Sequence, residues 1–366
     1  MRMARRIALC LALLLLTGCA AGTPAAGTSA AQGIVQSTAA QSAAVSGAAV
    51  HESQLFAMDT YMTLRGYGDA APAALAEGTS LIQALDAALS AADEGSEIAA
   101  VNRGHGPVAV SADTAALLAR ALELSKALDG ALCLTLSPVL SAWGFVSGDY
   151  AVPDAGTLKE LLTRTGDEKV RLDGTTVETP DGVMLDLGAV AKGYAADRVT
   201  ALLQERGVGA AIVNLGGSTI RAYGTKPDGS PWRIAIRDPR DEAVYAAFLT
   251  LSEGAVDTSG GYERYFEQDG ETYWHILDPA TGAPARTGLV SVTVLTGDAF
   301  TGDALSTALF VMGPEKAAAY WRETGGFEFL CIDENDAFLV SEGAVGLFAP
   351  AGRYADAPVT VIRHED

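Results

Sequence analysis

The segments WRIAIRD (residues 232–238) and LVSVTVL (289–295) decide the fold class, because both have the apolar pattern of β-strands. Between them, paired runs on the two sides of the Gln-Asp-Gly-Glu stretch at 268–271 predict a hairpin. An earlier run, AAIVNLG (210–216), also indicates a strand. Together these segments predict groups of antiparallel strands in the second half of the chain.

Apolar residues recur at helical spacing in three other places. These residues are Leu81, Leu85 and Leu89; Leu117, Ala121, Leu124 and Leu128; and Ala195, Val199, Leu202 and Leu203. Ser111 is the expected N-cap of the second helix, and Gly130 and Gly207 are expected stops. Because strands come in groups instead of alternating strictly with helices, we expect an α+β fold, a single large domain with mixed or antiparallel sheets and flanking helices. A division into two lobes stays open.

The composition excludes several classes of protein. The 366 residues are 49% hydrophobic and 19% charged, which is ordinary for a globular protein and excludes disorder of the whole chain. The formal net charge is −20, and no run of Lys and Arg follows the first six residues. We therefore expect no nucleic-acid binding, since phosphates along a duplex need a basic surface. A small phosphate-bearing ligand would need a metal or clustered backbone N–H groups.

The N-terminus carries a targeting pattern. Arg2, Arg5 and Arg6 precede the apolar run 7–16, which is too short to span a bilayer but suits a signal peptide. The ending LTGC (16–19) resembles a bacterial lipobox, which implies cleavage of residues 1–18 and a lipid on Cys19. We expect an anchor at the extracytoplasmic or periplasmic face of a bacterial cell membrane.

A spacer follows the expected anchor. Residues 20–50 contain no charged residue and consist almost wholly of Ala, Gly, Ser, Thr, Gln and Val, so 19–52 is expected to be a flexible tether. The folded domain is expected to span 53–366. It contains two cysteines, Cys133 and Cys331, and we favour two free thiols over a disulfide.

Two glycine-containing motifs suggest a site for an anionic ligand. In LDLGAVAKGYAADR (185–198), Asp186 and a Gly-flanked turn lead into a helix, and Lys192 lies where it can reach a phosphate or pair with Asp186. NLGGS (214–218) places two glycines after a strand, which allows a ligand to approach the backbone. Taken alone, the first motif is equally a plain strand-to-helix junction, and the second is more simply explained as a bulge.

The segment DTSGGYERYF (257–266) leads into YWHILDPATGAP (273–284). His275 ends an aromatic strand there, beside hydroxyls and backbone donors, although a structural histidine would fit as well. Asp278 before a proline is expected only to build a turn. In the predicted helix TGDALSTALFVMG (301–313), Asp303 and Thr307 lie four residues apart and offer oxygen ligands for Mg²⁺. The alternative is a helix-terminal Asp and a Thr that bonds the preceding turn.

In combination, these motifs resemble the ApbE family, the FAD:protein FMN transferases. The resemblance runs from about Met58 to Gly313 and includes, in order, MDT (58–60), SEIAAVN (96–102), GALCLTLSPVLSAWGF (130–145), LDLGAVAKGYAADR, NLGGS, DTSGGYERYF, HILDPATG and DALSTAL. It implies an ApbE-like domain that binds FAD as substrate and, with Mg²⁺, transfers FMN to a Thr or Ser hydroxyl of another protein, releasing AMP.

The resemblance also implies roles for particular residues. The implied FAD contacts are Met58, Ala131, Leu132, Cys133, Asp186, Lys192, His275 and Ile276. Mg²⁺ would be held by the Ala189 carbonyl with the side chains of Asp303 and Thr307, and His275 would help to deprotonate the acceptor hydroxyl. The implied partners are extracytoplasmic acceptor proteins, such as subunits of membrane redox complexes or FMN-binding lipoproteins.

Two positions depart from the family pattern. Ala91 and Ala92 precede Asp93 where the family commonly has an aromatic residue, and Cys133 stands where it commonly has Asp. Two other functions stay open: a metal-dependent FAD pyrophosphatase that yields FMN and AMP, and a flavin-binding lipoprotein without catalysis.

Overall fold

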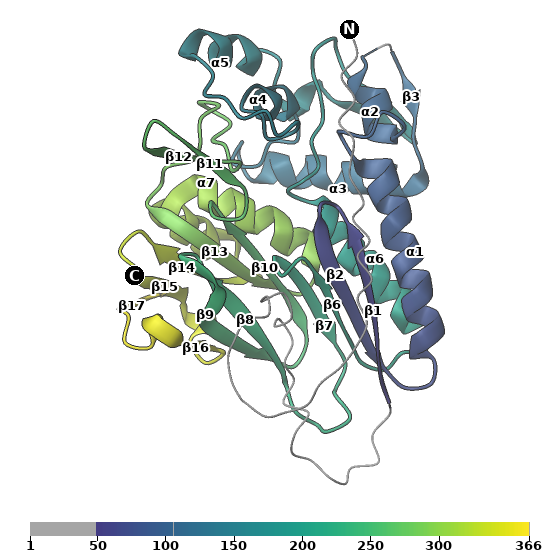
Figure 1. Ribbon diagram of the computed structural model, residues 1–366, viewed down its shortest axis with the longest axis vertical. Coiled ribbons are helices and arrows are strands. Elements are labelled where there is room, and N and C mark those ends of the chain that lie inside the picture. Colours follow the sequence, from purple (N-terminus) through teal and green to yellow (C-terminus); the bar gives the residue numbers. More distant parts are fainter. Residues whose placement is uncertain (1–48, 105, 366) are drawn as a thin grey trace, which may run out of the picture. The chain divides into compact units, whose positions relative to one another are not determined.

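A nine-stranded sheet is the centre of the computed structural model, which describes residues 49–104 and 106–365 (Figure 1). Neighbouring strands are antiparallel except for the parallel pair β15 and β17. In spatial order, the strands are β1 (Val50–Ala57), β2 (Thr60–Tyr67), β6 (Ala211–Leu215), β7 (Thr219–Tyr223), β10 (Gly254–Gly260), β13 (Leu289–Thr296), β14 (Glu328–Asp333), β15 (Phe338–Ser341) and β17 (Val359–Ile362).

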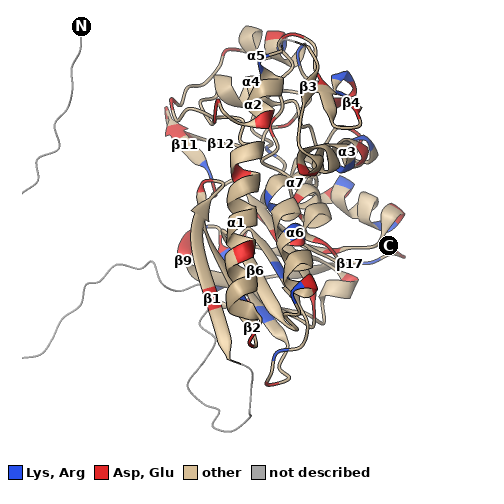
Figure 2. Cartoon of the chain, turned by 90° about the vertical axis from the view of Figure 1, so that its right-hand side faces the viewer, with Lys and Arg blue, Asp and Glu red and all other residues tan. Residues whose placement is uncertain are grey.

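Helices α1, α6 and α7 cover one face of this sheet (Figure 1). Figure 2 shows α1 and α6 side by side in front of the strands. The helices are α1 (Ala71–Leu89), α2 (Glu97–Asn102), α3 (Ala112–Ala127), α4 (Ser137–Ala142), α5 (Ala155–Leu162), α6 (Ala191–Glu205) and α7 (Ala299–Thr324). Short 3₁₀ turns are η1 (Asp167–Lys169), η2 (Glu342–Ala344) and η3 (Gly352–Tyr354).

A three-stranded sheet covers the opposite face. It comprises β8 (Trp232–Asp238), β9 (Asp241–Leu251) and β16 (Phe348–Pro350) in the order β16-β9-β8. Successive side chains of a strand point to opposite faces of its sheet, which explains the two cores. On β6, Val213 packs in the helix-side core. Its neighbour Ile212 packs in the core that contains Ile234 and Ile236 of β8. The fold therefore has three layers, with a core on each face of the large sheet.

Smaller elements lie together beyond one end of the large sheet, in the upper part of Figure 1. They include the sheet β3 (Val108–Ala109), β5 (Thr176–Glu178) and β4 (Arg171–Asp173), and the hairpin β11 (Tyr265–Gln268) and β12 (Glu271–Trp274). Trp143, Phe145 and Leu158 form a separate apolar cluster against Phe266 and Tyr273 of the hairpin. This cluster supports the segment that leads into His275.

The structure confirms the α+β fold and the predicted strands and helices, except that Asp186 ends no strand: only an isolated bridge between Met184 and Leu136 precedes the turn into α6. Ser111 caps α3 by accepting the Thr114 N–H, and the residues around 268–271 form the β11–β12 hairpin. The last predicted helix begins earlier, at Ala299, and continues past an interruption at Gly313, where φ is 77°.

The expected start of the domain at Ser53 falls inside β1, because β1 pairs with β2 from Val50 onward. The expected signal peptide, Cys19 and most of the tether lie outside the described residues. Within 49–104 and 106–365, no helix is long and apolar enough to cross a membrane.

Candidate active site

The predicted metal ligand Asp303 lies where α6 and α7 meet. The backbone N–H of Gly193 on α6 donates to Asp303 Oδ2 at 2.9 Å. The approach is close, since a Cβ on Gly193 would lie 2.3 Å from the Ala299 carbonyl oxygen. Asp197 on α6 accepts the N–H groups of Ala299 and Phe300, and so caps the start of α7. These contacts hold the Asp303 carboxylate at the junction.

We expect Gly193→Ala to destabilise this junction. The new methyl group would contact backbone atoms of Ala299 and Phe300, which cannot rotate away. Overpacking of this kind costs roughly 1–3 kcal/mol, so the melting temperature should fall by several degrees. Gly209→Ala is the matched control, because a Cβ there meets nothing within 4 Å. Equal melting temperatures for the two variants would contradict the close approach.

Thr307 lies one turn beyond Asp303 on the same face of α7. Its hydroxyl is 3.1 Å from Ser259 Oγ on β10. Neighbouring residues fill the two roles considered above as alternatives for Asp303 and Thr307, namely the helix cap and the bond to the preceding turn. Asp298 is the N-cap of α7, and Ser306 bonds back to the Asp303 carbonyl at 2.9 Å. The carboxylate of Asp303 and the hydroxyl of Thr307 therefore have no capping task within α7.

Lys192 extends from the first turn of α6 and hydrogen-bonds to Ser218 in the NLGGS loop. Asn214 Oδ1 accepts the Gly217 N–H at 2.7 Å, which closes the loop between β6 and β7. Gly216 and Gly217 both have φ of 79°, as a tight hairpin turn requires. The geometry of the turn therefore explains why both residues are glycine. The loop also places the Ser218 hydroxyl beside the Lys192 ammonium.

His275 follows β12 and is fixed by the Arg264 carbonyl, which accepts from the His275 backbone N–H at 3.1 Å and lies 3.2 Å from Nδ1. A carbonyl can only accept, so Nδ1 carries the proton and Nε2 carries the lone pair. Burial, together with the Arg264 and Lys192 cations, lowers the pKa of His275 to about 3. The imidazole is therefore neutral, with Nε2 ready to accept a proton. Ile276, the next residue, is buried.

This pKa implies a pH dependence of stability. Below the unfolded value near 6.5, the unfolded chain binds a proton at His275 that the native protein does not, so stability is lost as the pH falls from about 6.5 toward 3. From pH 7.5 to 5, the wild type should lose about 1–2 kcal/mol more than His275→Gln. Urea unfolding of both proteins at several pH values measures this. If the free energies of unfolding of the two proteins fell equally with pH, the pKa of His275 would be the same in the folded and unfolded chain.

Asp186 joins two segments of the site. Its backbone N–H donates to the Leu134 carbonyl at 2.7 Å, and its Oδ1 accepts the Gly188 N–H at 2.9 Å. Burial raises the pKa of Asp186, while the Gly188 N–H and the Arg264 cation lower it. Asp186 therefore forms a hydrogen bond within its own turn, which contains Ala189. Lys192 instead forms its hydrogen bond with the β6–β7 loop.

The loop that contains Cys133 is organised by Asp167. Both carboxylate oxygens accept the Leu134 N–H, at 3.0 and 2.9 Å, and Thr135 Oγ1 donates to Oδ1 at 2.9 Å. Asp167 thus supplies a carboxylate in the loop where Cys133 departs from the family pattern. Burial and this carboxylate raise the pKa of the Cys133 thiol to about 11. Cys133 and Cys331 are both free, which confirms the prediction of two thiols.

The other predicted FAD contacts lie on the helix side of the large sheet. Met58 and Asp59 form the turn between β1 and β2 with φ of 48° and 59°, and the Met58 N–H donates to Asp86 Oδ1 at 3.0 Å. Leu132 is part of the helix-side core, and Met58 and Ala131 pack against it. Asp278 builds a turn by accepting the Ala280 N–H, as expected.

The electrostatics of the site favour a cation. Burial raises the pKa of Asp303 to about 6, although Lys192 and the Gly193 N–H act in the opposite direction. Asp257 on β10 is fully buried, and burial together with repulsion by Asp303 raises its pKa well above the usual range. The described residues hold no cluster of three or more His, Cys, Asp or Glu side chains suited to a metal. A cation would therefore depend also on hydroxyl, carbonyl, substrate and water oxygens.

Sequence reasoning missed several residues of the site, namely Asp197, Ser218, Asp257 and Ser259. The one local signal was Asp257, a carboxylate within the small and apolar residues of β10 (GAVDTSG, 254–260). The other contacts join residues far apart in the chain, such as Lys192 and Ser218.

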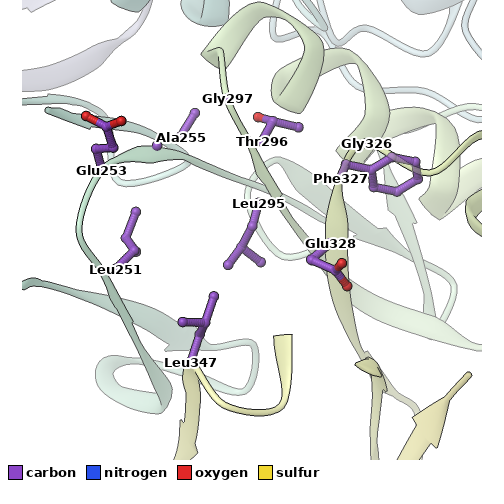
Figure 3. Close-up of a pocket in the computed structure, with 11 residues that line it drawn as sticks. Leu251, Glu253, Ala255, Leu295, Thr296, Gly297, Gly326, Phe327, Glu328 and Leu347 are labelled. Carbon is purple, nitrogen blue, oxygen red and sulfur yellow. The ribbon is translucent and has the colours of Figure 1, made fainter. Parts of the chain in front are cut away.

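A cavity of about 290 Å³ lies elsewhere, near the beginning of β10. In Figure 3, the side chains of Leu251, Leu295 and Leu347 point into it, and Glu253 and Glu328 lie at its sides. It contains none of the predicted site residues. Two of the predicted site residues, Lys192 and Asp303, lie instead at the α6–α7 junction.

Comparisons with known proteins identify the family of this chain. The family model described as "ApbE family" matches residues 58–331. The FAD:protein FMN transferase of Treponema pallidum (strain Nichols) is 38% identical over 292 residues, which cover 75% of this chain and 80% of that protein. The FAD:protein FMN transferase of Klebsiella pneumoniae (strain 342) is 37% identical over 251 residues, which cover 68% of this chain and 77% of that protein.

Solved structures agree as well. The ApbE protein of Thermotoga maritima has a TM-score of 0.76 at 34% identity, covering 81% of this chain and 98% of its own. The flavin transferase ApbE of Vibrio cholerae has a TM-score of 0.73 at 30% identity, covering 82% of this chain and 99% of its own. The fold, the order of the motifs and the extent of these matches show that this chain belongs to the ApbE family.

Proposed function

We propose that this protein transfers FMN from FAD to a Thr or Ser hydroxyl of an acceptor protein, in a reaction that depends on Mg²⁺. Curated relatives carry the name FAD:protein FMN transferase. The observation that carries the proposal is the α6–α7 junction, where Lys192 in the first turn of α6 acts electrostatically both on Asp303 of α7 and on the neutral His275. One side of the site can neutralise a pyrophosphate, and the other can accept a proton.

The reaction balances with the groups present. The acceptor oxygen forms a bond to the phosphorus of the FMN half, and the bond from that phosphorus to the bridging oxygen breaks. AMP leaves with the bridging oxygen, and the hydroxyl proton passes to His275 Nε2. The Arg264 carbonyl keeps Nδ1 protonated during this step, so the imidazole presents one lone pair.

Lys192 is the residue proposed to bind the pyrophosphate, and its ammonium is held in place by Ser218. Since the Lys192 cation lowers the pKa of His275, an anionic pyrophosphate beside Lys192 would raise that pKa toward neutrality. Asp186 and the 131–133 segment, joined through Leu134, are proposed to bind other parts of FAD.

The residues present fit Mg²⁺. Asp303 Oδ2 is occupied by the Gly193 N–H. The other Asp303 oxygen, the Thr307 hydroxyl and the Ala189 carbonyl would supply the hard oxygen ligands that Mg²⁺ prefers. The buried Asp257 carboxyl group nearby has no hydrogen-bond partner among the described residues, so in its ionised form only a cation would neutralise it. When bound, Mg²⁺ supplies charge neutralisation to the pyrophosphate oxygens.

The test follows both products. The full chain in detergent is incubated with FAD, Mg²⁺ and a candidate acceptor protein, while AMP release and the acceptor's intact mass are recorded. Transfer requires one AMP for each FMN added to the acceptor. Equal AMP and free FMN without an acceptor would instead establish the pyrophosphatase, and FAD binding without products would leave a flavin-binding lipoprotein.

We further propose that the protein is anchored by a lipid on Cys19 at the extracytoplasmic face of a bacterial membrane, where it modifies redox-complex subunits or FMN-binding lipoproteins. The LTGC pattern supports this location. Cys19→Ser should abolish labelling by a palmitate analogue. The protein should then be found as soluble protein or as the uncleaved precursor instead of the lipid-anchored form in the membrane fraction. Unchanged labelling of this variant would place the lipid elsewhere.

A further inference from the structure

Asp257 is a buried carboxylate that no local contact explains. It lies on β10 in the middle of the nine-stranded sheet and has no exposed surface. Within the described residues, neither oxygen has a hydrogen-bond partner. Thr219 lies opposite on β7 and lowers the pKa of Asp257, yet its hydroxyl falls short of hydrogen-bond geometry and is itself unpartnered. An uncompensated buried carboxylate is costly, so a compensating group is expected.

The direction of this side chain follows from the alternation of β10. Ala255 packs in the helix-side core, and Ser259 bonds Ser306 and Thr307 of α7. Asp257 lies between them in the strand and therefore points to the same face. A Cβ on Gly302 would lie 2.1 Å from Asp257 Oδ2. The carboxylate therefore contacts the backbone of α7 immediately before Asp303.

Two buried carboxyl groups from different elements thus lie near each other, since Asp257 contacts Gly302 and Asp303 is the next residue of α7. One oxygen of Asp303 is satisfied by the Gly193 N–H, whereas Asp257 has no such donor. Lys192 acts on both carboxylates electrostatically, but it hydrogen-bonds to Ser218. A buried water could donate to Asp257 and Thr219, but a water carries no charge, so two ionised carboxylates there would still need a cation.

We propose that Asp257 supplies the second negative charge of the divalent-cation site formed by Asp303 and Thr307, acting on the cation directly or through one water. This inference rests on the proposed Mg²⁺ dependence. Mg²⁺ in proteins commonly has one or two carboxylates with waters and substrate phosphates. Asp257 is then a positioning residue that strengthens cation binding and does not touch the reacting phosphorus.

The experiment measures cation binding without catalysis. Mn²⁺ binding to the full chain in detergent, with and without FAD, is followed by electron paramagnetic resonance. Asp257→Asn keeps the shape and removes the charge, so its Mn²⁺ dissociation constant should rise at least tenfold. Thr219→Val is the matched control, because it removes the other unpartnered polar group without changing charge, and its affinity should stay within twofold of wild type.

Melting in EDTA provides the second readout. Asp257→Asn should melt at the same or a higher temperature than wild type, because it removes an ionisable buried group without hydrogen-bond partners, while its stabilisation by Mg²⁺ should shrink. Asp257→Ser repeats both measurements with a smaller uncharged side chain. An Mn²⁺ affinity within twofold of wild type, or equal losses in Asp257→Asn and Thr219→Val, would overturn the inference. A wild type that binds no Mn²⁺ in either condition would instead overturn the proposed metal dependence.

Discussion

Asp303→Ala should reduce the Mg²⁺-dependent transfer rate by about two to three orders of magnitude. Removing one group that stabilises the charge developing in a transition state raises the barrier by about 3–4 kcal/mol. Each 1.4 kcal/mol of barrier lowers the rate by a factor of about ten. The carboxylate is buried at the α6–α7 junction, so no solvent-exposed side chain can take its place. AMP release at saturating Mg²⁺ measures the loss.

Asp303→Asn separates the metal role from packing. The amide oxygen can still accept the Gly193 N–H, so the stability of this variant should exceed that of Asp303→Ala by about 1–3 kcal/mol. Its transfer rate should be almost as low, because it lacks the charge. Asp298→Asn on the same helix is the control, since Asn remains a good N-cap there. Wild-type turnover by Asp303→Ala at saturating Mg²⁺ would remove Asp303 from the metal site.

His275→Ala should leave FAD affinity within a few-fold of wild type and lower the transfer rate by about 10²–10⁴. The reason is that the imidazole is neutral and its Nδ1 is committed to the Arg264 carbonyl, so its main contribution is the lone pair on Nε2. Fluorescence titration measures FAD binding, and the acceptor's intact mass over time measures transfer.

His275→Gln provides a stricter comparison, because glutamine can donate a hydrogen bond to the Arg264 carbonyl but cannot act as a base. It should be as slow as His275→Ala. His51→Ala on β1 is the matched control and should transfer FMN at the wild-type rate. If His275→Gln retained full activity, the imidazole would have a binding role and the proton would leave by another route.

Much of the fold was predictable because it depends on local patterns. The alternation in WRIAIRD specified β8, and the Ser111 cap with the apolar spacing from Leu117 specified α3. The motifs also identified the family, since each keeps its residues within a short segment. The start of the domain was less accurate, because the pairing of Val50 with Tyr67 is decided by β2 and not by residues near Val50.

The sequence by itself determined the fold class, the family and the kinds of residue in the site, because helix and strand periods and short motifs are set by neighbouring residues. Only the tertiary structure decided which of these residues meet. The Gly193 N–H and the Asp303 carboxylate are 110 residues apart in the chain, and no local pattern encodes their contact. The same holds for Asp257, whose buried carboxylate faces α7 because three layers pack together there. Burial and packing across elements set the charge of the site, and these properties arise only when the chain is folded.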